Sequence, residues 1–235
     1  ASADMVPDVG DNVFQICFTD SSQGAKAAEY IKEHELGTKI GIIWNNAQDY
    51  SSGIKNAFVE KAKELDLEIV ATPAFSDDNA PDFSAAVNEV KQAGADLVFL
   101  PIYYTPEYKI LFYANSIEYT PVFYGVDGTD GILEQDNVDK TIVEGLMYLT
   151  PYTPNSADER TSAYTQAFYD KFGYNPNQFG ADEYDALFVL KVLCEKAGIT
   201  AETSREEACE KLIAAITADD FSFEGITGTM TWSTD

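Results

Sequence analysis

The sequence has few basic residues. It contains 15 Lys and Arg against 40 Asp and Glu, which gives a formal net charge of -25. Binding to nucleic acid requires clustered Lys and Arg that neutralise phosphates, and the Lys of this chain mostly stand singly. An anionic membrane surface would repel the chain as well. The charge balance therefore argues against a nucleic-acid partner and against direct binding to a membrane.

Histidine and cysteine are also scarce. The single histidine is His34, and the three cysteines, Cys17, Cys194 and Cys209, include no CxxC pair. Imidazole and thiolate groups are too few to assemble a metal cluster, so we expect no metal and no cofactor. Cys194 and Cys209 are compatible with a disulfide or with two separate buried thiols, and the sequence alone leaves both open.

The chain lacks the patterns of membrane spans and of common catalytic sites. No run of about 18 apolar residues is present, and the N-terminal segment has neither the basic nor the apolar region of a signal peptide. The GxSxG, GxxxxGK[ST], GxGxxG and HExxH motifs are absent as well. His34 lies among charged residues with no candidate nucleophile nearby in the sequence, so we predict no catalytic residues and no enzymatic activity.

Short β-branched runs alternate with amphipathic stretches along the chain, and 45% of its residues are hydrophobic. This alternation predicts an α/β fold with a parallel sheet that helices flank on both faces. The expected strands are residues 13–18, 39–44, 68–71, 96–101, 121–126 and 145–149. The expected helices are residues 20–35, 50–65, 83–92, 106–116, 157–172, 180–196 and 204–216. The last three helices have little strand between them, so we expect them to pack on strands elsewhere in the chain or beyond it.

Polar and aromatic residues gather in the loops that follow the predicted strands. Open parallel sheets bind ligands beyond the carboxyl ends of their strands. The loops in question are residues 45–50, 103–105 and 127–129, together with the opening residues 1–3. A zwitterionic amino acid needs an anion for its ammonium, donors for its carboxylate and apolar or aromatic walls. Asp127, Ser2 and the loop tyrosines match these needs.

Simpler interpretations of the same residues stay open at this point. An Asp-Gly pair after a strand is a common turn, and Asp127 is equally suited to capping a short helix. Tyr50 could simply be the first residue of a helix, with no role in binding. Tyr104 could pack against Tyr108 on the surface. Residue type and spacing do not distinguish these alternatives.

In these loops the sequence resembles the periplasmic leucine/isoleucine/valine-binding protein family, which has a type I two-lobed fold. The resemblance covers nearly the whole chain and depends on the order of several short segments. They are FTDSSQG at 18–24, YSSG at 50–53, DFS at 82–84, YTPE at 104–107, GVDG at 125–128, YDAL at 184–187 and GTMTW at 228–232.

The resemblance implies a set of ligand-binding residues: Ser2, Ala3, Tyr50, Tyr104, Asp127, Gly128 and Phe179. Ser2 would donate to the ligand carboxylate from the first lobe, and Tyr50 and Tyr104 would be the ligand tyrosines of the second. Asp127 would pair with the ligand ammonium, although it is one methylene shorter than the Glu often found there. Phe179 falls near an aromatic wall of the family's pocket.

The resemblance also implies an organisation and a role. Residues 1–19 and 152–223 are expected to form part of lobe 1, and residues 20–151 and 224–235 to form lobe 2. The family's earlier βα units of lobe 1 are not in this sequence, so we expect a fragment with weak or no binding of its own.

The expected function is to capture an amino acid outside the cytoplasm, between two lobes, and to deliver it to the transmembrane subunits of an ABC permease. A lipid anchor outside this chain would be the only link to a membrane. The alternative is a sensor ectodomain of the same fold, and a cytosolic α/β enzyme is a more distant alternative.

Overall fold

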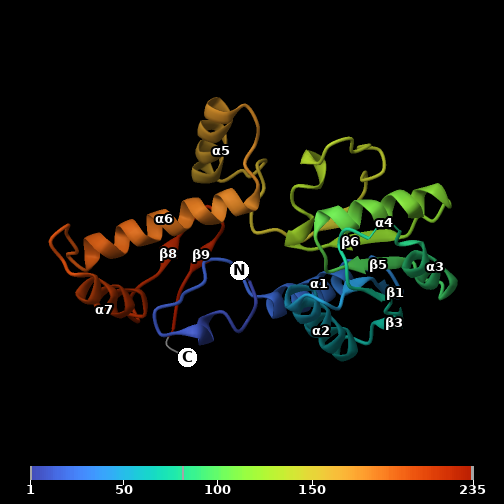
Figure 1. Ribbon diagram of the computed structural model, residues 1–235, viewed down its shortest axis with the longest axis horizontal. Helices are drawn as coiled ribbons and strands as arrows, with labels where there is room; N and C mark the ends of the chain where they lie inside the picture. The colour runs from blue at the N-terminus through green and yellow to red at the C-terminus, as the bar shows by residue number, and fades with distance from the viewer. Residues whose placement is uncertain (1, 81, 234–235) are drawn as a thin grey trace. The chain divides into compact units, whose positions relative to one another are not determined.

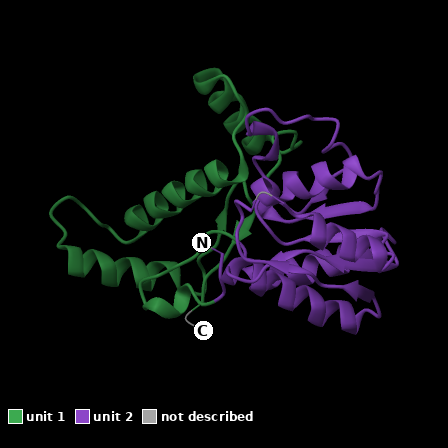
Figure 2. Ribbon diagram, turned by 45° about the vertical axis from the view of Figure 1, so that its right-hand side comes forward, with its two compact units in different colours: residues 1, 5–17, 151–235 green, residues 2–4, 18–150 purple. Residues whose placement is uncertain are grey.

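The computed structural model describes residues 2–80 and 82–233. These residues form two compact units, which Figure 2 colours separately. Unit 1 comprises residues 5–17 and 151–233, and unit 2 comprises residues 2–4, 18–80 and 82–150. Compactness does not by itself define the lobes of a binding protein, so the lobe boundaries given above stay a prediction.

Unit 2 is built on a five-stranded sheet in the order β3-β1-β5-β6-β7, and every neighbouring pair is parallel. The strands, in that order, are Glu68–Ala71, Lys39–Ile42, Leu97–Leu100, Val122–Gly125 and Met147–Tyr148. From β1 the chain first adds β3 on one side and then β5 on the other (Figure 1). The sheet thus has a topological switch point between β1 and β5, where loops at the carboxyl ends diverge and leave room for a ligand.

Helices cover both faces of this sheet, as the sequence predicted. They are α1 (Asp20–Glu33), α2 (Asp49–Glu64), α3 (Ser84–Gln92) and α4 (Tyr104–Ser116). In β5, Leu97 and Phe99 pack with α1 and α2, whereas Val98 and Leu100 pack with α3 and α4. Successive strand residues point to opposite faces, so a strand covered on both sides is apolar throughout.

Two short parallel strands and two 3-10 turns extend the carboxyl side of the sheet. The strands β2 (Trp44–Asn45) and β4 (Ala74–Phe75) pair with each other. The turns η2 (Asp127–Thr129) and η3 (Ile132–Glu134) follow β6. Residues 127–129, predicted as a loop, therefore form a tight helical turn at the sheet's edge.

Unit 1 contains the turn η1 (Pro7–Val9), three helices and a hairpin. The helices are α5 (Glu159–Phe172), α6 (Gln178–Lys196) and α7 (Arg205–Ile216), and β8 (Phe223–Glu224) pairs antiparallel with β9 (Thr229–Met230). The carboxylate of Asp185 accepts bonds from the backbone N–H of Ile226 and of Thr227 at 3.0 and 2.9 Å, which ties α6 to the hairpin.

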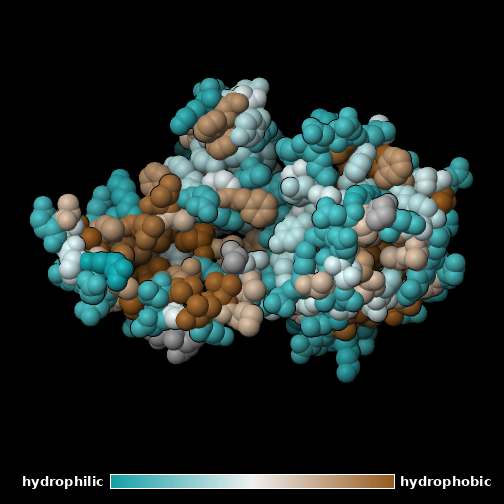
Figure 3. All heavy atoms as spheres, in the orientation of Figure 1, coloured by the Kyte–Doolittle hydropathy of each residue, from teal (hydrophilic) through white to brown (hydrophobic). Residues whose placement is uncertain are grey.

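Apolar side chains of unit 1 gather over α6 and α7 (Figure 3). Val189, Leu193 and Ile216 are buried there, and a largely apolar cavity of about 460 Å³ lies between these helices and residues 12–16. Leu187 and Leu190 of α6 nevertheless remain 66% and 50% exposed. Within the described part of unit 1, the two-residue strands of the hairpin are the only strands, so these helices have no sheet of their own.

The predicted strand at residues 13–18 is wrong, because this segment has irregular backbone. Phe14 and Ile16 pack beside the core of α6 and α7, and the Trp232 indole donates to the carbonyl of Gln15 at 2.7 Å. A β-branched run becomes a strand only where another strand pairs with it, and here side-chain packing takes that place. The thiols of Cys194 and Cys209 are not joined in a disulfide.

No helix within residues 2–80 or 82–233 is both long enough and apolar enough to span a lipid bilayer.

Helices α1 and α2 pack unusually closely at Gly24. A Cβ at this position would lie 2.2 Å from the carbonyl oxygen of Ile54 and 2.7 Å from the backbone nitrogen of Phe58. Both atoms are backbone, so neither can move aside without shifting α2.

We predict that Gly24→Ala lowers the free energy of unfolding by about 1–3 kcal/mol, because the added methyl group overpacks this contact. Chemical denaturation followed by circular dichroism measures the loss. The matched control is Gly180→Ala in α6, where the nearest atom to an added Cβ is the Tyr164 hydroxyl at 3.3 Å, a side-chain atom and not backbone. Equal stability of the Gly24→Ala protein and the wild type would contradict the prediction, because it would mean that α1 and α2 accommodate the methyl group without cost.

Candidate functional site

Three loops meet at the carboxyl edge of the unit 2 sheet. One follows β2 and opens α2 at Asp49, another follows β5 and opens α4 at Tyr104, and the third follows β6 as η2. These are the loops that the sequence singled out. They lie at the switch point of the sheet, where its topology favours a ligand site.

The centre of the site is a contact between Tyr50 and the turn η2. The Tyr50 hydroxyl donates to Oδ1 of Asp127 and accepts from the backbone N–H of Gly128 at 3.0 Å. Gly128 permits this approach, because a Cβ there would lie 2.7 Å from the Tyr50 hydroxyl and from the Ile102 carbonyl oxygen. Asp127 is only 7% exposed, so its carboxylate is held in the site and not in bulk water.

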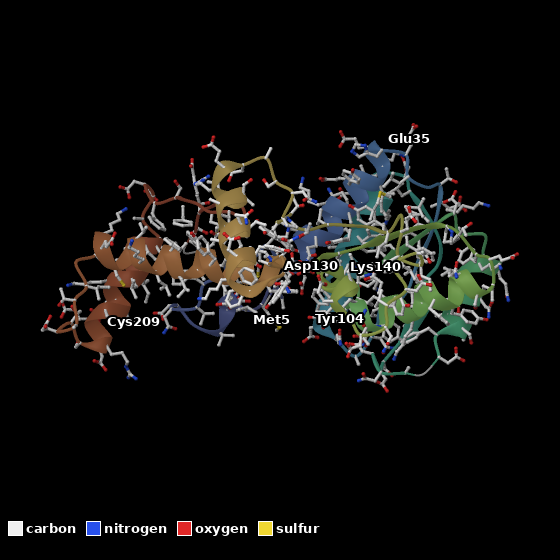
Figure 4. The ribbon with its side chains drawn as sticks, turned by 90° about the horizontal axis from the view of Figure 1, so that it is seen from above. Met5, Glu35, Tyr104, Asp130, Lys140 and Cys209 are labelled. Atoms are coloured by element: carbon white, nitrogen blue, oxygen red, sulfur yellow. The ribbon has the colours of Figure 1, made fainter. Side chains whose placement is uncertain are left out.

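The aromatic wall beside this contact is Tyr103. Its ring stacks on Tyr50 with centroids 4.6 Å apart and planes inclined by 17°. Tyr104, which the sequence favoured, lies instead against the turn after η2, and a Cβ on Gly131 would be 3.3 Å from its ring. Figure 4 labels Tyr104 and Asp130 at this edge of the sheet. Tyr50 and Asp127 are thus in direct contact, whereas Tyr104 lies beside Gly131 in the following turn.

A second acidic residue, Asp20, lies close to Asp127. Asp20 is the first residue of α1, is 1% exposed, and its backbone N–H donates to the Ser2 carbonyl at 2.8 Å. Gln23, one turn later, is fully buried and accepts the backbone N–H of Asp127 through Oε1 at 3.1 Å. The helix α1 therefore connects the opening segment, which includes Ser2, to η2.

Burial dominates the ionisation of these groups. It raises the pKa of Asp127, although the nearby Tyr50, Gln23 and Gly128 backbone N–H oppose the shift. Burial also raises the pKa of Asp20 to about 6; the nearby Ser2 lowers the pKa, and the nearby Asp127 raises it further. The pKa of the Tyr50 phenol is raised well above its usual range by burial and by Asp127, so the phenol remains a donor. The site is consequently negative and poorly hydrated.

A polar network positions the loop that carries Tyr50. The amides of Asn45 and Gln48 donate to the two oxygens of Asp78 at 2.7 and 2.6 Å. The Ser51 hydroxyl accepts the backbone N–H of Asn45 at 2.8 Å. Because Ser51 follows Tyr50 in the first turn of α2, this network sets where the tyrosine emerges.

The remaining predicted residues are less closely associated with this centre. Ser2 contacts Asp20, and Ala3 is part-buried in the same opening segment. Phe179 belongs to the other unit, on α6, where it is 43% exposed. Within the described residues, no group of three or more His, Cys, Asp or Glu has the geometry of a metal site.

Sequence reasoning missed three residues of this site: Asp20, Gln23 and Tyr103. Asp20 opens the helix predicted at residues 20–35, and the residue that caps this helix is Thr19, whose hydroxyl accepts the Ser22 N–H at 3.3 Å. A usable signal was present for Gln23, which is a polar residue on the face of α1 that also buries Ala27 and Ala28. Tyr103 carried no signal that separated it from its neighbour.

Comparison with known proteins decides the family. The model of the family described as "Periplasmic binding protein" matches residues 2–235. The chain belongs to the periplasmic binding protein family. The α/β architecture and the resemblance predicted from the sequence are both confirmed, and the type I fold of the branched-chain amino-acid binding proteins is the fold of this chain.

Among curated periplasmic binding proteins, the Leu/Ile/Val-binding protein homolog 1 of Brucella abortus is 27% identical over 190 residues, which are 80% of this chain and 49% of that protein. The leucine-, isoleucine-, valine-, threonine- and alanine-binding protein of Pseudomonas aeruginosa is 24% identical over 202 residues, 86% of this chain and 52% of that protein. The chain thus spans about half the length of these relatives.

Solved structures of the same fold support the assignment to this fold. The leucine-binding protein LivK of Thermotoga maritima superposes with a TM-score of 0.84 at 26% identity, covering 99% of this chain and 63% of that one. The substrate-binding protein LivJ of Streptococcus pneumoniae, solved with isoleucine, gives a TM-score of 0.79 at 22% identity, covering 100% of this chain and 68% of that one. The second likeness, at this identity, speaks for the fold alone.

We predict that Tyr50→Phe destabilises the protein by about 1–3 kcal/mol, because it leaves the buried Asp127 carboxylate and the Gly128 N–H without the hydroxyl. Urea unfolding at neutral pH measures the change. Tyr103→Phe is the matched control, because it keeps the stacked ring pair and does not touch this hydrogen bond. A loss of equal size in both variants would mean that the rings, and not the hydroxyl, hold the site.

We predict that Asp20→Asn stabilises the protein at pH 7 by about 1–3 kcal/mol and leaves its stability at pH 4 unchanged. The folded pKa of about 6 exceeds the ordinary carboxyl pKa of 3.8, so the wild type loses stability as the pH rises between these two values. Unfolding measured from pH 4 to pH 8 reveals the difference. Asp49→Asn, at the exposed first turn of α2, should leave the profile parallel to wild type. If the stability of Asp20→Asn and of the wild type changed with pH in parallel, the raised pKa of Asp20 would be contradicted.

Proposed function

We propose that this chain is part of an extracytoplasmic solute-binding protein that captures an amino acid, branched-chain or similar, between two lobes. The loaded protein then delivers the amino acid to the transmembrane subunits of an ABC permease. No covalent step is involved, and the protein is not an enzyme. The observation that carries the proposal is the buried Asp127, held by Tyr50 and Gly128 at the switch point of the sheet.

The chemistry of the site suits an ammonium group. Asp127 and Asp20 supply anionic acceptors in a poorly hydrated setting, where attraction to a cation is stronger than in water. The stacked rings of Tyr50 and Tyr103 supply a flat apolar surface beside them. A small molecule with a positive end and an apolar body, such as a leucine-like amino acid, meets both needs.

The relatives support the amino-acid class. Their names describe binding of leucine, isoleucine and valine, and for one of them also threonine and alanine. We assign the ligand carboxylate to the opening segment, where Ser2 and Ala3 lie, and an outer aromatic wall to Phe179 of the other lobe. Tyr104 and Gly128 complete the proposed set of ligand-binding residues. Closure of the two lobes around the ligand would produce the form that the permease recognises.

Calorimetric titration of the protein in its full natural length with the common amino acids tests the proposal. We expect binding of at least one aliphatic amino acid, and a loss of roughly 10- to 150-fold in affinity for Asp127→Asn, because a charge-assisted hydrogen bond is removed. The matched control is Asp130→Asn, which changes the net charge equally. No binding to any amino acid, or an equal loss in both variants, would overturn the proposal.

A further inference from the structure

A buried carboxyl group lies directly behind the candidate site. Glu107, in the first turn of α4, has no exposed surface. Its backbone N–H continues the helix by donating to the Tyr103 carbonyl at 3.2 Å, so the side chain starts from a fixed position. Fully buried Glu is rare in proteins unless it is paired, because burying a charge is costly. Nothing in the site described above makes use of this residue.

Glu107 faces the turn η2 across Gly125. A Cβ on Gly125 would lie 2.7 Å from Oε1 of Glu107 and 2.0 Å from the hydroxyl oxygen of Thr129, which is also fully buried. Among the described residues, neither Glu107 oxygen has a well-formed hydrogen bond, and the Thr129 hydroxyl is the polar group beside them. The two side chains therefore converge at Gly125, the last residue of β6, two residues before Asp127.

We propose that Glu107 is a positioning residue for ligand binding, which in its protonated form supports η2 through Thr129 and so holds Asp127 and Gly128 against Tyr50. The inference rests on the proposed function of this site, because its effect on the ligand passes through Asp127. The carboxyl group itself does not touch the ligand. The protonated carboxyl group is uncharged, fills the space behind η2 and has one O–H donor. The Thr129 hydroxyl is the acceptor within its reach.

Electrostatics agree with a neutral Glu107. Burial raises its pKa to about 8, and Thr129 opposes the shift. The elements that pack against α4 carry Glu89 and Lys91 in α3, Asp127 in η2 and Glu134 in η3, and Tyr148 in β7 interacts electrostatically with Glu107. Only burial and Thr129 shift the pKa of Glu107, so none of these charges compensates it and a negative charge on Glu107 would be buried without a partner. Deprotonation would therefore disfavour the packing of η2 against α4.

The first measurement is ligand affinity as a function of pH. Calorimetry with leucine from pH 6 to pH 9, on the full natural protein, should show wild-type affinity that falls roughly tenfold as the pH passes through about 8. Glu107→Gln, which resembles the protonated acid, should bind without this fall. Glu89→Gln, at an exposed position of α3, should follow the wild type. Titration of the ligand itself affects all three proteins equally and cancels in the comparison.

The second measurement is stability without ligand. The folded pKa of about 8 is above the ordinary Glu pKa of 4.5, so the wild type should lose stability as the pH rises from 4.5 to 8. Glu107→Gln should remove that slope and be the more stable protein at pH 8. Thr129→Val should weaken leucine binding several-fold and reduce the pH dependence of affinity, because it removes the hydroxyl through which Glu107 supports η2. It should keep the pH dependence of stability, because the carboxyl group is still buried.

The outcomes separate the two proposals. If no form binds an amino acid, the proposed function fails, and the positioning role fails with it, whatever the unfolding profile shows. If the wild type binds leucine but Glu107→Gln has the same pH dependence of affinity, the positioning role alone is overturned. Loss of the slope in both affinity and stability supports it.

Discussion

Unit 2 depends on a sheet that is buried on both faces. The central strand β5 has no exposed residue, and its side chains alternate between the α1–α2 core and the α3–α4 core. A strand in this position cannot carry a charged side chain on either face without burying it unpaired. Polar groups are therefore displaced to the loops beyond the carboxyl ends of the strands. The location of the candidate site follows from this constraint before any particular residue is considered.

Those loops bring acidic groups together in a buried place, whereas their ionised forms would be more stable apart and in water. Asp127 and Asp20 are buried near each other, Glu107 lies behind them, and burial raises the pKa of all three carboxyls. Such an arrangement lowers the stability of the protein, a cost that is common at functional sites. A ligand with a positive group would relieve the repulsion that the fold maintains. The cost to stability and the proposed binding of a cationic group thus have one physical source.

Several parts of the fold were predictable because local pattern and tertiary setting agree. The strand at 68–71 and the helices of both units match their predicted positions within a few residues, since apolar periodicity reports the faces that are buried. Residues 13–18 show where this fails. Their composition favours a strand, but extended backbone needs a partner strand for its hydrogen bonds, and Phe14 and Ile16 pack on helices instead. A propensity scale contains no information about the partner.

The sequence by itself determined that the chain is acidic, that it alternates strands with helices, and that Tyr50 and Asp127 follow two of those strands. Only the tertiary structure decided that their side chains meet, that Tyr103 and not Tyr104 stacks on Tyr50, and that Asp20 and Glu107 are buried beside them. The reason is that periodicity describes one element at a time. Contacts between the start of α1, the start of α4 and the turn η2 depend on how four helices pack on one sheet.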